Sequence, residues 1–249
     1  MAIISLVAIA AIAAAIYFWR GQQAATARLQ AAQADANHTQ QTFKAGKTAI
    51  DAVVSDLANG FGKSATLQAS QQIAIMAGVE RAMDALVSRA GNDPEVQRSQ
   101  ASMYVQFSTT YLGLGDTKLA VDSARKGLAI FRALAAAQPD DDDMQSNVGL
   151  SQEKLAEALR ASGDAKGALA ADRESLEVAR ALAAKNPGNR QFRTDVVLAL
   201  WRLAEAGDQP RERLTEALKI LKDLKLAAML TPDQEKWIAM IEDELARMQ

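Results

Sequence analysis

Two kinds of helix-breaking residue pattern recur through the chain at nearly constant spacing. The prolines Pro94, Pro139 and Pro187 stand 45 and 48 residues apart, and Gly-Asp pairs stand 48 and 44 residues apart. The Gly-Asp pairs are Gly115-Asp116, Gly163-Asp164 and Gly207-Asp208. Apolar residues recur between them at helical spacing, so each unit reads as two helices joined by a turn. A repeat of this length is typical of a helical solenoid, in which each hairpin buries its apolar face against its neighbours.

The composition favours an all-α fold. Hydrophobic residues make up 49% of the chain but aromatic residues only 5%, so the core is built of Ala, Leu, Ile and Val. Runs of alternating β-branched or aromatic residues, which predict strands, are almost lacking.

The N-terminal segment is a near-continuous apolar run. Residues 2–19 carry no charge, end in Tyr17-Phe18-Trp19 and are followed by Arg20. Eighteen residues at a rise of 1.5 Å span about 27 Å, close to the hydrocarbon core of a bilayer. We expect residues 1–20 to form a transmembrane helix in the cell membrane. A cleaved signal peptide and a buried core helix are the alternatives.

The basic residues that flank this run predict its orientation. Arg20 and Arg28 follow the run, and no Lys or Arg precedes it, so the positive-inside rule places the bulk of the chain in the cytoplasm.

Four further segments follow the apolar run. Residues 21–42 are rich in Ala and Gln and predict a helical juxtamembrane spacer, which we also consider for homo-oligomer formation. Residues 43–92 predict an atypical helical hairpin, and residues 93–230 contain the repeats. Residues 231–249 open with a capping box, Thr231 with Gln234 three residues on, and predict a terminal capping helix.

The repeats resemble the tetratricopeptide repeat (TPR) family over about residues 93–249. The resemblance rests on a small residue after an apolar one in the first helix, the Gly-Asp turn, an Ala four residues after its Asp, and the terminal Pro, as in Leu155-Ala156, Gly163-Asp164, Ala168 and Pro187. It implies a right-handed α-solenoid of helical hairpins that binds a protein or peptide partner.

The units depart from the 34-residue family pattern in two ways. The second helix is about two turns longer, and the third unit has Gln209-Pro210 and Glu212 where a small residue is expected. The long form, with its stretches 179–184 and 186–189, is similar to the membrane-helix-plus-repeat region of bacterial multidomain proteins with TIR or caspase-like effectors. That similarity implies a role in signalling or defence.

The sequence offers little for catalysis, cofactors or nucleic acid. One histidine and no cysteine exclude Cys-His triads and dual-His metal sites. The acidic run 140–143 lacks the alternating ligands, glycine and glutamate of a calcium loop. A net charge of −2 gives no general attraction to phosphates. We therefore expect a protein that is not an enzyme, with no cofactor, no metal and no nucleic-acid partner.

The resemblance implies that the first helices of successive units line a concave binding surface. The residues that we expect on this surface are Gln106, Thr109, Glu153, Glu157, Arg160, Arg193, Val197, Trp201 and Arg202. Trp201 and Arg202 are the strongest pair because Trp and Arg are enriched at interface hot spots. The alternative for Trp201 is a place in the core.

These observations predict a membrane-anchored scaffold or adaptor that binds a protein or peptide partner. A periplasmic scaffold for envelope assembly is the alternative, and the topology of the chain distinguishes the two.

Overall fold

The computed structural model describes residues 44, 47–48, 51–52, 54–55, 68–91 and 93–248. The chain divides into two units, Met1–Ala49 and Ile50–Gln249, and the helices described below belong to the second. The predicted transmembrane helix (1–20) and spacer (21–42) lie outside the described residues. Among the helices of the described part, none combines the length and apolar character needed to cross a bilayer.

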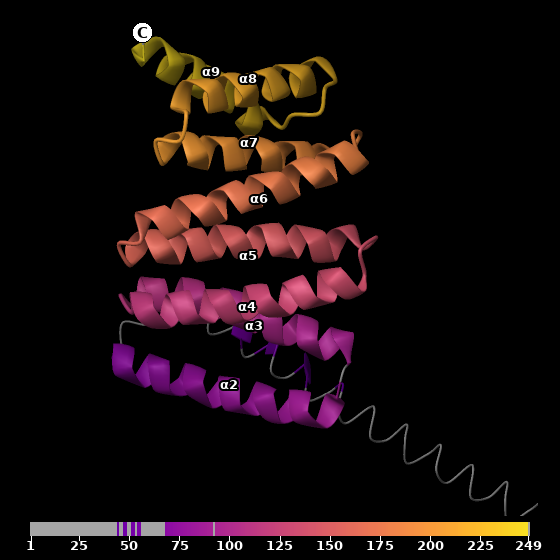
Figure 1. Cartoon of the computed structure of the whole chain (residues 1–249), viewed down its shortest axis with the longest axis vertical. Helices are drawn as coiled ribbons and strands as arrows, with labels where there is room; N and C mark the ends of the chain where they lie inside the picture. Colours follow the sequence, from indigo (N-terminus) through magenta and orange to yellow (C-terminus); the bar gives the residue numbers. More distant parts are fainter. Residues whose placement is uncertain are drawn as a thin grey trace, which may run out of the picture. The chain divides into compact units, whose positions relative to one another are not determined.

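The described part of the second unit is all helical, as the composition predicted, and its packing is consistent with an α-solenoid. Each helix packs against the next one along the chain (Figure 1). The helices are α2 (Ala69–Ala90), α3 (Pro94–Gly113), α4 (Thr117–Ala137), α5 (Asp142–Ala161), α6 (Ala165–Lys185), α7 (Arg190–Glu205), α8 (Pro210–Leu226) and α9 (Pro232–Arg247). The first helices of the three units are α3, α5 and α7, and the second helices are α4, α6 and α8.

The first helices begin at side-chain caps that recur with a period of 48 residues. Asp93, Asp141 and Asn189 each accept hydrogen bonds from the backbone N–H groups two and three residues on. These caps satisfy donors that the first turn of a helix would otherwise leave unpaired. The period at this end of the units is therefore more regular than the spacing of the prolines.

Each hairpin turns at a glycine with left-handed backbone geometry. Gly115, Gly163 and Gly207 have φ values of 81°, 89° and 80°, which side chains with a Cβ rarely adopt. The third unit reaches its turn early because α7 has 16 residues where α3 and α5 have 20. This shortening explains why the Gly-Asp spacing falls from 48 to 44 residues.

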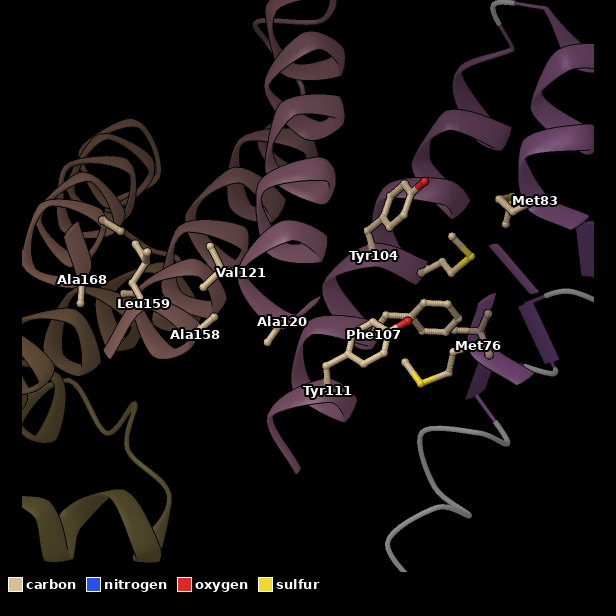
Figure 2. Close-up of a cluster of buried hydrophobic side chains, with 14 residues drawn as sticks. Met76, Met83, Tyr104, Phe107, Tyr111, Ala120, Val121, Ala158, Leu159 and Ala168 are labelled. Carbon is tan, nitrogen blue, oxygen red and sulfur yellow. The ribbon is translucent and has the colours of Figure 1, made fainter. Parts of the chain in front are cut away.

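The core is made of apolar side chains shared between neighbouring helices. Figure 2 shows Met76 and Met83 of α2 facing Tyr104, Phe107 and Tyr111 of α3. Two further clusters of buried residues continue the core toward α9. Within the predicted 43–92 hairpin, the buried Val54 belongs to the same cluster as the two methionines.

The predicted capping box at the start of α9 is present. The Thr231 hydroxyl accepts from the backbone N–H of Gln234, and the Gln234 side chain accepts in return from the backbone N–H of Thr231 at 3.0 Å. The side chain of Ile241 is fully buried, so α9 is anchored to the rest of the fold. Its role as a terminal cap stays a prediction.

The packing of α3 on α4 depends on the missing side chain of Gly127. A Cβ at this position would lie 2.9 Å from Val105 Cγ2 and 3.0 Å from the backbone oxygen of Ala101. The backbone oxygen cannot move aside without shifting α3.

We expect Gly127→Ala to lower the free energy of unfolding by about 1–2 kcal/mol, because the overpacking outweighs the gain in helix propensity. Gly113→Ala is the matched control, since a Cβ there would have no neighbour within 4 Å. Urea unfolding followed by circular dichroism measures both. Equal stabilities of the two variants would contradict the close approach at Gly127.

Candidate partner-binding cleft

The first helices of the second and third units leave a cleft between them. α3 and α5 pack directly against each other, but α5 and α7, both fully described, do not. The gap has a volume of about 250 Å³, and α6 forms its floor. Its lining residues come from α5 (Ser146, Gly149, Leu150, Glu153), α6 (Ser175, Val178, Ala179, Leu182) and α7 (Gln191, Asp195, Leu198, Arg202).

Much of the cleft wall is apolar. Leu150 is 46% exposed, which makes it one of the most exposed large apolar side chains of the described residues. It lies with Leu198 along the walls, above Leu182 of the floor. Gly149 lets α5 approach the floor closely, since a Cβ there would lie 3.2 Å from Val178. An exposed apolar wall of this kind suits a ligand with apolar groups of its own.

An ion pair bridges the cleft. Arg202 Nη2 of α7 lies 3.0 Å from Glu153 Oε2 of α5, and the two side chains are 26% and 28% exposed. Because the backbones of α5 and α7 do not approach each other closely, this side-chain pair links the two walls directly. Both side chains are therefore partly shielded from water at the cleft.

Asp195 lies on the same wall as Arg202 but lacks an ion-pair partner. Its Oδ1 accepts a hydrogen bond from Gln191 Nε2 at 2.8 Å, and no cation of the described residues forms an ion pair with it. Burial raises the pKa of the Asp195 carboxyl, and the charge of Glu153 raises it further, against the effect of Gln191 and Arg202. Asp195 is therefore a partly desolvated carboxyl group at the cleft.

A second carboxylate is buried on α6. Asp172 is 2% exposed and accepts a hydrogen bond from Arg160. Its other oxygen, Oδ1, has no hydrogen-bond partner. Burial raises the pKa of Asp172, and the charges of Arg160 and Arg202 oppose that rise. The ionised form of Asp172 is consequently costly to the fold.

Two of the predicted surface residues meet in this cleft, and four lie elsewhere on α3 and α5. Glu153 and Arg202 form the bridging ion pair. The others do not line the cleft: Gln106 is partly buried, Thr109 is exposed, Glu157 pairs with Lys154 at 2.9 Å, and Arg160 binds Asp172.

Two of the predicted residues of α7 lie away from the cleft. Val197 is fully buried in a core cluster, so it has no surface to present to a partner. Arg193 lies on another side of α7, in a recess with residues of α6 and α8 such as Arg180 and Glu216. Both were expected on the concave surface because the resemblance implies that the first helices line it.

Trp201 has features of both of its predicted roles. It is partly buried and packs against the same core cluster as Val197. It also lines a recess of about 350 Å³ between α7 and α9, beside Met240 and Glu244. Met240 is 53% exposed there. The recess lies between α7 and α9 in the same way as the cleft lies between α5 and α7.

Sequence reasoning missed Asp195, Gln191 and Leu198, although the helical period contains a signal for them. The core-facing residues of α7 include Val196, Leu200 and Leu203. At 100° per residue, the stripe of Gln191, Asp195, Leu198 and Arg202 lies nearly opposite them. The stripe of Arg193, Val197 and Trp201 borders the core instead.

Comparison with protein-family models and with curated proteins finds no match for this chain.

The third Gly-Asp turn differs from the first two and joins successive units. Asp116 and Asp164 cap the helices that follow them, whereas Asp208 accepts hydrogen bonds from Arg173 of α6 and Arg213 of α8. Asp208 is 8% exposed. The hydrogen bond from Arg173 lowers the pKa of Asp208 most, and the hydrogen bond from Arg213 lowers it further.

We expect Asp208→Asn to lower the free energy of unfolding at pH 7 by about 1–3 kcal/mol, because it removes a charge that two guanidinium groups bind. Since the pKa of Asp208 is lowered in the fold, this contribution is present above the ordinary carboxyl pKa and is lost as the pH falls through the lowered value.

Asp172→Asn is the matched comparison, because ionisation of Asp172 affects the stability of the fold in the opposite direction. The pKa of Asp172 is raised in the fold, so its ionisation weakens stability as the pH rises through that value. We expect this variant to lose little or no stability at pH 7. Thermal unfolding between pH 3 and pH 7 measures both variants, and parallel curves for them would contradict the two pKa directions.

Proposed function

We propose that this chain is a TPR-like scaffold or adaptor that binds a segment of another protein in the cleft between α5 and α7. The observation that carries the proposal is the cleft itself, where two neighbouring first helices stand apart and expose Leu150 beside partly buried charges. Interfaces commonly combine an apolar centre with a polar rim.

The proposal includes attachment to a membrane through residues 1–20, with the repeats in the cytoplasm. The apolar run and its flanking arginines support this part of the proposal. Tethering would raise the local concentration of the adaptor near membrane-bound partners. A role in bacterial signalling or defence follows from the resemblance to long-unit repeat proteins.

The proposal assigns binding and no catalytic step. No group of three or more His, Cys, Asp or Glu side chains in the described part of the chain is arranged to hold a metal ion. The charged side chains of the cleft are engaged mainly in holding the walls, as Glu153 and Arg202 are.

Site-specific photo-crosslinking in the native cells tests this proposal. A photoreactive phenylalanine analogue replaces Leu150 in the cleft or, as the matched control, the exposed Ala129 on α4. We expect a discrete crosslinked protein from position 150 and none from position 129. Absence of any product at position 150, or the same products from both positions, would contradict the proposal.

A further inference from the structure

Asp195 stands out among the charged groups of the cleft. Glu153 is paired with Arg202 across the gap, whereas Asp195 has only the amide of Gln191 as a partner, on its Oδ1 atom. An acidic group that is partly removed from water and has no ion-pair partner is unfavourable for the free protein. A cationic ligand group would remove that cost.

The surroundings of Asp195 limit the shape of such a group. The volume of about 250 Å³ is below the roughly 300–1,000 Å³ of typical small-molecule sites, so it suits one large side chain. The walls provide Leu150 and Leu198, and the floor provides Leu182, in the same cleft as the carboxyl group. A side chain with an aliphatic stem and a charged tip can cover such walls and keep its charge at the carboxylate.

Among the described residues that line the cleft, the one cation, Arg202, is already engaged. Arg202 lies seven residues after Asp195 on α7, about 10 Å along the helix axis, and pairs with Glu153. The Oδ2 atom of Asp195 has no hydrogen bond to a described residue and can accept from an ammonium or a guanidinium group.

We propose that the cleft receives a lysine or arginine side chain of the partner segment, with its charged head at Asp195 and its methylenes along Leu150, Leu182 and Leu198. This inference rests on the proposed function and adds the chemistry of the partner: a peptide segment with one basic anchor.

A display library of random heptapeptides, selected on the full chain in detergent, tests the inference. We expect the selected peptides to share one position occupied by Lys or Arg. Replacing that residue of a selected peptide by norleucine should weaken binding to the wild-type chain by about tenfold or more, as expected for a charge-assisted hydrogen bond. This peptide comparison requires no variant of the protein.

Asp195→Asn keeps the shape of the side chain and can still accept from Gln191. We expect this variant to bind the basic and norleucine peptides equally, whereas Asp122→Asn, an exposed control on α4, should bind as the wild type does. Calorimetry measures the affinities.

The possible failures are distinguishable. Selected peptides without a basic position, or undiminished binding of the basic peptide to Asp195→Asn, would overturn the inference and leave the proposed function standing. Selection of no peptide at all would overturn both.

Discussion

Every helix of the described unit packs chiefly on its neighbours along the chain, and this constraint decides where a binding surface can form. The second helix of each unit lies between two successive first helices. The two first helices can either meet across it or stay apart. α3 and α5 meet directly, whereas α5 and α7 stay apart over α6. The cleft, its exposed Leu150 and its bridging ion pair all follow from that separation.

The irregular third unit shows how the stack accommodates a shorter hairpin. α7 and α8 are about one turn shorter than their counterparts, and Gln209, which precedes α8, adopts a left-handed conformation without a side-chain cap. Asp208 is thereby released from capping and binds Arg173 of the preceding unit. The Gly-Asp motif therefore turns the hairpin in all three units, but its Asp caps the next helix in two of them and joins two units in the third.

Local patterns in the sequence predicted the helices and their turns. They did not predict contacts between residues that are far apart in the chain. The turn glycines and the capping box of Thr231 depend on a few adjacent residues, so their pattern can be read directly. The role of Asp208 depends on Arg173, which is 35 residues away, and no local pattern reports it. Val197 was expected on the concave surface but is buried, because its side of α7 borders the core.

The stripe of α7 that contains Asp195 and Leu198 borders an open cleft, whereas the neighbouring Val197 is in the core. Thiol labelling tests this claim directly, since the chain has no native cysteine. The rates to compare are those of Leu198→Cys and Val197→Cys with a small maleimide under native conditions. We expect labelling at position 198 to be at least tenfold faster than at position 197, because position 197 reacts only when the structure opens. Equal rates, or faster labelling at position 197, would contradict it.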